Sequence, residues 1–140
     1  MAFLIDTNVV SELRRKTANP HVLQWQQQYS IELSWISTLS ILEILDGTER
    51  VRKSDPIFAQ KLDNWYQNIL LKAYSGRILS VTQSTCEIKA SLSIERTLPF
   101  ADGLIAATAK EHQLTLVTRN VKDFEDLGIN LINPWEHPID

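Results

Sequence analysis

The sequence has little of what disulfide-bonded, zinc-binding or membrane proteins need. Its 140 residues include one cysteine, Cys86, so no internal disulfide can form, which suits a reducing cytoplasm. Three scattered histidines offer no spacing that would hold zinc. No apolar run approaches the roughly 18 residues of a membrane span, and no basic and apolar leader precedes the first acid, Asp6. We therefore expect a cytoplasmic protein with no membrane span and no signal peptide.

Positive charge and common catalytic motifs are also scarce. The net charge is −3, whereas nucleic-acid binders are usually basic. This argues against nucleic acid as a partner unless the acids are concentrated in a metal site, where bound cations reverse the local sign. The sequence has no Gly-rich phosphate loop and no serine–histidine constellation. The chemistry must therefore be sought among the acids.

What the sequence does contain is a regular alternation of short apolar runs and helical patterns. This alternation predicts one α/β domain over residues 1–140, with a parallel sheet covered on both faces. Asn19-Pro20 and Asp55-Pro56 mark helix starts, and Gly47 and Gly76 mark helix ends. A capping box over Ser84–Glu87 starts another helix, which extends to about Ile94. The expected strands cover residues 3–6, 31–36, 77–81, 114–118 and 129–132, and the longer helices cover 37–47, 56–73, 84–94 and 101–111.

Four acids lie at or after the ends of predicted strands, or at the start of a predicted helix. Asp6 ends the first strand, and Glu43 lies in the second turn of the helix after the second strand. Asp102 opens an alanine-rich helix, and Asp123 follows the fourth strand. Right-handed crossovers bring the carboxyl ends of parallel strands to one edge, where ligands bind in open α/β sheets. We therefore expect these acids to gather there.

Glu43 is the most informative of these acids. Residues 41, 42, 44 and 45 around it are all apolar, so the helix is predicted to be buried most of the way round. An isolated carboxylate is rarely buried, because removing its charge from water costs several kcal/mol. Asp102 has similar apolar neighbours. Both positions therefore favour a bound cation.

Each acid alone also has an ordinary structural interpretation. Asp6 could cap a helix, Asp102 could be an acid that the helix dipole favours, and Asp123 could be a solvated turn residue. The conjunction favours Mg²⁺ or Mn²⁺, because hard cations prefer oxygen ligands. A Mg²⁺ ion held by carboxylates can lower the pKa of a bound water and orient a phosphodiester. The predicted chemistry is therefore metal-assisted hydrolysis of a phosphodiester.

Several cations could hold a phosphate backbone. Arg119 and Lys122 are the best candidates because they lie next to the presumed active edge. Arg14 and Arg15 are further candidates for RNA binding. For most of the cations, a solvated surface charge is the ordinary interpretation.

The motifs that carry these residues resemble the PIN domain across nearly the whole chain. They are Asp6-Thr7-Asn8 after an apolar strand, Ser37…Glu43…Gly47, the run ADGLIAATA over 101–109, the run VTRNVKDF over 117–124, and the closing Asn133-Pro134-Trp135. Their order and spacing are similar to those of the VapC-type toxins of bacterial toxin–antitoxin pairs, including the FitB-like branch.

This resemblance implies a three-layer α/β/α fold with a central parallel sheet of four to five strands. It implies an endoribonuclease toxin of a type II toxin–antitoxin system, a hydrolase that depends on Mg²⁺ or Mn²⁺ and uses a metal-activated water. It also implies a cognate antitoxin that blocks the site, and a toxin homodimer or a toxin–antitoxin hetero-oligomer. By position, Asp6, Glu43 and Asp102 match the three core acids; Thr7, Asn8 and Thr118 match supporting polar positions; and the fourth acidic position falls on Asn120, with Asp123 the nearest acid.

Two other functions compete with this interpretation. Phosphotransfer through Asp6, as in haloacid-dehalogenase-like phosphatases, wants a second aspartate two residues on, where Asn8 stands. The main alternative is a PIN-like module that binds nucleic acid or protein without catalysis. The complete set of acids argues against it.

Overall fold

Five short parallel strands form the centre of the computed structural model, which describes residues 1–92 and 96–140. The strands are β1 (Phe3–Ile5), β2 (Ser34–Ser37), β3 (Ile78–Leu79), β4 (Thr115–Val117) and β5 (Leu131–Ile132). Their order in the sheet is β3-β2-β1-β4-β5, and every neighbouring pair is parallel. The predicted α/β fold with a parallel sheet is confirmed.

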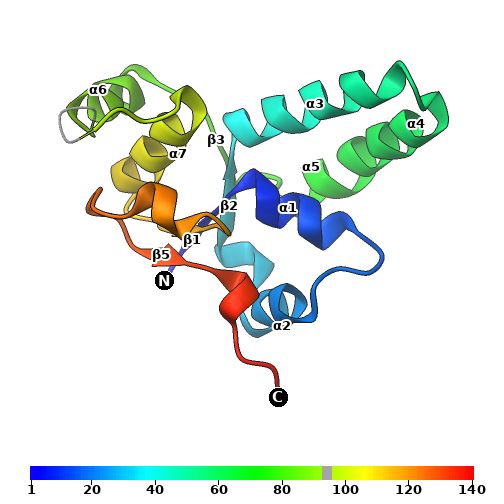
Figure 1. Ribbon diagram of the computed structural model, residues 1–140, viewed down its shortest axis with the longest axis horizontal. Coiled ribbons are helices and arrows are strands. Elements are labelled where there is room, and N and C mark those ends of the chain that lie inside the picture. The colour runs from blue at the N-terminus through cyan, green and yellow to red at the C-terminus, as the bar shows by residue number, and fades with distance from the viewer. Residues whose placement is uncertain (93–95) are drawn as a thin grey trace.

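Helices cover both faces of this sheet. They are α1 (Thr7–Arg14), α2 (Pro20–Gln28), α3 (Thr38–Arg52), α4 (Pro56–Trp65), α5 (Leu71–Ala73), α6 (Gln83–Leu92) and α7 (Phe100–Glu111). Shorter helical segments are η1 (Ile31–Leu33), η2 (Tyr66–Leu70), η3 (Val121–Phe124) and η4 (Pro134–Glu136). Figure 1 shows α6 and α7 on one side of the strands and α1 to α5 on the other.

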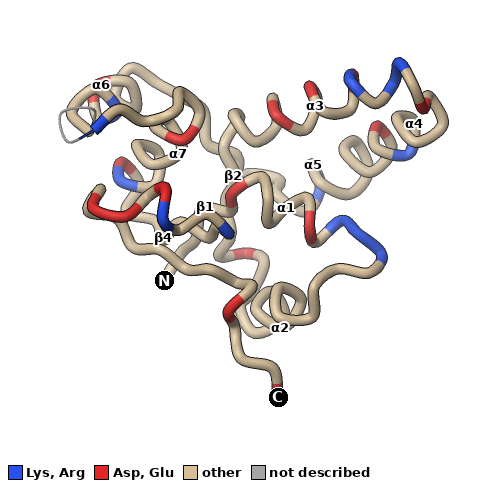
Figure 2. Tube along the Cα trace, in the orientation of Figure 1, with Lys and Arg blue, Asp and Glu red and all other residues tan. Residues whose placement is uncertain are grey.

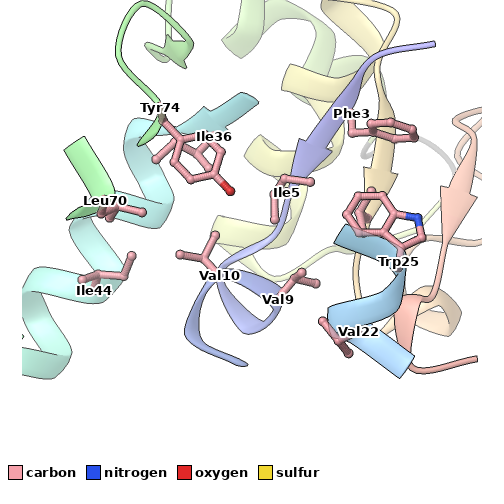
Figure 3. Packing of buried hydrophobic residues seen from close by; sticks show 11 residues of the cluster. Phe3, Ile5, Val9, Val10, Val22, Trp25, Ile36, Ile44, Leu70 and Tyr74 are labelled. Atoms are coloured by element: carbon pink, nitrogen blue, oxygen red, sulfur yellow. The ribbon is translucent and has the colours of Figure 1, made fainter. Parts of the chain in front are cut away.

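The alternation of β1 explains why the sheet needs two covers. Phe3 and Ile5 are buried in one apolar cluster and Leu4 in another, because successive strand side chains point to opposite faces. The first cluster includes Trp25 of α2, whose ring meets that of Phe3 edge to face with centroids 5.2 Å apart (Figure 3). The second cluster includes Ile105 of α7.

Most helix starts follow their local signals. Asn19 and Asp55 cap α2 and α4 through side-chain oxygens that accept from backbone N–H groups two and three residues on. The predicted Ser84–Glu87 capping box is wrong. The first turn of α6 is instead capped reciprocally by Thr82 and Thr85, each of whose hydroxyls accepts from the other's N–H at 3.4 and 3.1 Å. The predicted end of this helix at Ile94 lies outside the described residues.

Two predicted boundaries are also corrected. Gly47 does not end α3, which continues to Arg52, because this glycine does not adopt the positive φ by which a glycine commonly ends a helix. Residues 31–33 form η1 rather than a strand, since the Ser30 hydroxyl accepts from Glu32 N–H and starts a turn. Gly76 does end its helical stretch, with φ +77°.

The predicted helix over residues 56–73 is interrupted by one π-helical stretch. Segment η2 joins α4 to α5 without a break in the chain.

Within the described ranges, no helix is both long and apolar enough to cross a membrane.

Candidate active site

Asp6 lies where β1 ends and α1 begins, and its carboxylate is held on both oxygens. Oδ1 accepts a hydrogen bond from Thr7 N–H at 2.8 Å, which makes Asp6 the N-cap of α1. Oδ2 accepts from the buried Thr118 hydroxyl at 2.8 Å and from Asn8 Nδ2 at 3.4 Å. The side chain is therefore both a helix cap and a carboxylate fixed at the sheet edge, so the two sequence interpretations are compatible.

The polar residues after β4 tie this edge together. Besides binding Asp6, the Thr118 hydroxyl accepts from Asn120 N–H at 3.1 Å and from Asn8 Nδ2 at 3.4 Å. The Oδ1 atom of Asn8 accepts from Arg119 N–H at 3.3 Å. The carboxyl ends of β1 and β4 are thus joined through side chains as well as through the sheet, which fixes where Asp6 points.

Glu43 is exposed rather than buried, so the prediction of its burial is wrong. Helix α3 buries only one stripe, formed by Ser40, Ile44 and Thr48 at four-residue spacing. Leu39 and Ile41 pack at the edges of the two apolar clusters, but Leu42 and Leu45 face outward and are 54% and 37% exposed. Glu43 nevertheless reaches the site, because its Oε1 accepts from the Thr7 hydroxyl at 2.8 Å.

The other two acids lie on α7 and η3. Asp102 is half-buried in the first turn of α7, and Asp123 is exposed on η3. Figure 2 shows acidic positions at the start of α1, along α3, at the start of α7 and in the segment after β4. Elements far apart in the sequence therefore carry acids to the same end of the sheet.

Electrostatics shows that these four acids interact. Burial raises the pKa of Asp6 above its ordinary value, hydrogen bonds from Thr118 and Thr7 oppose that rise, and the charges of Glu43 and Asp102 add to it. Burial also raises the pKa of Asp102, and the charges of Asp123 and Glu43 raise it further. Negative charges that raise the pKa of Asp6 and Asp102 favour the approach of a cation.

The donor set fits a hard divalent cation by its chemistry. It consists of carboxylate oxygens together with hydroxyls and amides, which Mg²⁺ and Mn²⁺ prefer. In the part of the chain that the structure describes, no three acidic, histidine or cysteine side chains are close enough to form a metal site together. The acids that would hold the cation are therefore gathered at one edge but spaced apart from one another.

The predicted phosphate-binding cations are divided between two places. Arg119 and Lys122 are exposed next to the acidic edge, and the Arg119 guanidinium lies over the Trp135 ring, 5.0 Å from its centroid. Arg14 and Arg15 lie at the other end of α1. Arg14 stacks near Phe58 and Trp65 and lines a hollow of about 240 Å³ that Thr7 and Glu43 also line, and Arg15 pairs with Glu12 at 3.3 Å.

Two residues of this region were missed in the sequence. Ser40 is fully buried, and its Oγ lies 2.8 Å from the Thr7 hydroxyl, which links α3 to α1. A small polar residue three positions before Glu43 was the available signal. The Arg96 guanidinium donates to the backbone carbonyl oxygens of Asp123 at 2.5 Å and Glu125 at 3.3 Å. No local sequence motif predicts that contact.

The parallel sheet and the acids at its carboxyl edge define the chain as an α/β protein with an acidic site. Comparison with known proteins then identifies its family. The PIN domain family matches residues 3–130, so this chain belongs to the PIN domain family.

Two curated proteins are similar over almost their full length. The plasmid stability protein StbB of Pseudomonas syringae pv. tomato is 33% identical over 141 residues, covering 95% of this chain and 98% of that protein. The VapC ribonuclease Y4jK of Sinorhizobium fredii is 32% identical over 140 residues, covering 95% of this chain and 97% of that protein. The predicted resemblance to VapC-type toxins is confirmed.

Solved structures agree with this placement. The crystal structure of FitAcB from Neisseria gonorrhoeae superposes with a TM-score of 0.87 at 29% identity, covering 96% of this chain and 99% of that chain. A toxin–antitoxin complex from Klebsiella pneumoniae gives a TM-score of 0.70 at 25% identity, covering 96% of this chain and 98% of that chain. Structural neighbours of this chain are thus toxin–antitoxin complexes.

Proposed function

We propose that this chain is an endoribonuclease toxin of a type II toxin–antitoxin system, which hydrolyses RNA phosphodiesters in the cytoplasm with Mg²⁺ or Mn²⁺. One observation carries the proposal. The buried carboxylate of Asp6 is fixed by the Thr118 hydroxyl. Its pKa is raised by burial and by the nearby charges of Glu43 and Asp102. Such an arrangement costs stability in the absence of a cation, which is understandable if the acids serve to bind one.

The residues proposed to hold the metal are Asp6, Glu43 and Asp102, with Asp123 or Asn120 at the fourth position. A divalent cation bound there supplies a Lewis acid that lowers the pKa of water and offsets the phosphate charge. The chain's own contribution is orientation. Thr118 and Thr7 N–H hold the Asp6 carboxylate, while the Thr7 hydroxyl holds Glu43. In the overall reaction, the oxygen of water bonds to phosphorus, the bond from phosphorus to the leaving ribose oxygen breaks, and the proton that the water loses is balanced by one that the leaving oxygen gains.

RNA cleavage with matched acid variants tests this proposal. We expect the wild-type chain to cut RNA with Mg²⁺ and to stop when EDTA removes the metal. Asp6→Asn and Asp102→Asn should each lower the cleavage rate at least about a hundredfold, since such losses are typical when a group acting on the transition state is removed. Asp46→Asn is the control, because Asp46 is an exposed acid three residues after Glu43 on the same helix.

The alternative of a non-catalytic PIN-like module makes the opposite prediction. Such a module would bind RNA or protein, but EDTA and both site variants would leave any trace of cleavage unchanged. Full activity in either variant would refute the assigned site, even if the chain does cut RNA.

We also propose that the chain forms a homodimer and binds a cognate antitoxin in a toxin–antitoxin hetero-oligomer. The exposed apolar side chains of α3 support an interface there, since Leu42 and Leu45 flank Glu43 and are 54% and 37% exposed. Family membership and the toxin–antitoxin structures that resemble this chain support the antitoxin. An interface between two copies at α3 would lie next to the acids, so the second copy would affect access to them.

A further inference from the structure

The Arg119 guanidinium is held by an aromatic ring rather than by an acid. Its carbon lies 5.0 Å from the centroid of the Trp135 ring. Among the described residues, no salt bridge includes Arg119, and the one hydrogen bond it makes uses its backbone N–H. A ring face attracts the cation without occupying its N–H donors, so those donors stay available to an anion.

The ring itself is anchored by the C-terminal segment. The backbone N–H of Trp135 donates to Asn133 Oδ1 at 3.0 Å, and the half-buried ring packs against the apolar cluster that contains Phe3 and Ile5 of β1. After η4, the carbonyl oxygen of His137 lies 2.6 Å from His21 Nδ1 on α2. Before the ring, β5 pairs with β4, so the segment is fixed to the body of the protein on both sides of the ring.

The stacked arginine is next to the proposed catalytic acids. Arg119 directly follows Thr118, which binds Asp6, and its own N–H binds Asn8. A planar guanidinium can bind a phosphate group through two parallel hydrogen bonds, and phosphates are the anions that an RNA strand carries. A strand of RNA placed over Asp6 would thus bring one of its phosphates within reach of Arg119.

From this geometry we propose that Arg119 and Trp135 form a preformed subsite for a phosphate of the RNA strand. Arg119 binds the phosphate, and Trp135 is a positioning residue that orders the guanidinium before RNA arrives. Ordering a long side chain in advance strengthens binding, because less freedom is lost in the complex. This inference rests on the proposed ribonuclease function and goes beyond it by assigning a role to the C-terminal segment.

The test measures RNA affinity in an Asp6→Asn background that does not cut. A fluorescein-labelled single-stranded RNA oligonucleotide serves as the probe, and anisotropy gives its Kd at several salt concentrations. Arg119→Ala should weaken binding about tenfold and should reduce the salt slope by about 0.7, the value for one phosphate contact on a single strand. Trp135→Leu should weaken binding about threefold to tenfold.

The double variant separates positioning from general damage. If Trp135 acts through Arg119, then Arg119→Ala with Trp135→Leu should bind no more weakly than Arg119→Ala alone. Trp135→Phe keeps a ring face and should bind RNA nearly as well as the parent. Lys53→Ala is the charge control and should leave Kd within about twofold of the parent, since Lys53 is exposed and lies roughly 20 Å along α3 from Ser40.

Three results would overturn the subsite. They are unchanged binding in Arg119→Ala, losses that multiply in the double variant, and a loss in Trp135→Phe as large as that in Trp135→Leu. A protein that binds and cuts RNA but gives any of these results keeps its proposed function and loses only the subsite. A protein that neither binds nor cuts RNA loses both.

Discussion

At the scale of single residues, Asp6 is a carboxylate in an unfavourable environment. Its side chain is only 9% exposed, and two neighbouring carboxylates raise its pKa further. The hydrogen bonds from Thr118 and Thr7 reduce that cost but do not remove it. Helix capping alone does not need this environment, because an asparagine caps equally well.

Because burial of the ionised Asp6 carboxylate costs stability, we predict that Asp6→Asn raises the melting temperature of the metal-free protein at neutral pH. Below the ordinary aspartate pKa of 3.8, the folded and unfolded states both carry the proton, so the variant should gain little there. The gain should grow as pH rises through the raised folded-state pKa and level off above it, because the ionised form is the one that burial penalises. Thermal melts in EDTA across this pH range measure it.

Adding Mg²⁺ should reverse the ranking of the two proteins. Wild type should melt at a higher temperature as Mg²⁺ is added, since a ligand that binds only the folded state stabilises it by mass action. Asp6→Asn should respond much less. An equal response of both proteins would show that Asp6 does not hold the ion.

A second prediction concerns Thr118, whose buried hydroxyl binds Asp6, Asn8 and Asn120. Thr118→Val keeps the shape but removes the hydroxyl, so we expect a loss of about 1–3 kcal/mol in the free energy of unfolding. RNA cleavage should fall as well, because Asp6 loses an orienting partner. Thr118→Ser keeps the hydroxyl and should recover most of both quantities. Urea titration and a cleavage assay on the same preparations make the comparison.

At the scale of elements, the glycines show how local backbone decides the effect of one substitution. Gly47 lies within α3, and a Cβ there would meet only Arg50 Nη2, at 3.8 Å. Gly76 has φ +77° with open space around it. The two positions therefore differ in backbone conformation and not in crowding.

We predict effects of opposite sign from the same chemical change. Gly47→Ala should stabilise the fold by about 0.5–1 kcal/mol, because alanine is the better helix former. Gly76→Ala should destabilise it by roughly 1–2 kcal/mol, the cost of left-handed backbone for a residue with a Cβ. Chemical denaturation of the two variants gives the sign directly. Destabilisation by Gly47→Ala would mean that α3 does not continue to Arg52.

At the scale of the whole molecule, exposed apolar side chains on α3 suggest a contact between copies. Leu42→Asp should convert the proposed homodimer to a monomer, because an interface core disfavours a carboxylate. Light scattering after size-exclusion chromatography measures the mass. Ile139→Asp is the matched control, since Ile139 is 46% exposed at the C-terminal end and lies outside α3. A wild-type monomer, or equal effects of both variants, would refute the interface.

Sequence patterns predicted best what depends on close neighbours along the chain. The caps Asn19 and Asp55, the end of the first strand just before Asp6 and the turn at Gly76 all depend on residues within about four positions. Where two local signals competed, the prediction failed. Ser84 and Glu87 fit the capping-box pattern, but the hydroxyls of Thr82 and Thr85 made the cap instead.

The exposure of Glu43 shows what the sequence could not decide. An apolar neighbourhood in the sequence does not say which of its side chains are covered, because coverage depends on the elements that pack against the helix. Helix α3 offers one stripe to the core and leaves Leu42, Glu43 and Leu45 facing outward.

The sequence by itself determined the order of strands and helices along the chain, and the places of Asp6 at the start of α1 and Asp102 in the first turn of α7, because hydrogen-bond capping and apolar periodicity are local. Only the tertiary structure decided that the Thr7 hydroxyl reaches Ser40 and Glu43, and that Arg119 stacks on Trp135. These contacts join residues 33, 36 and 16 positions apart, and they arise from how the helices and the C-terminal segment pack around a parallel sheet.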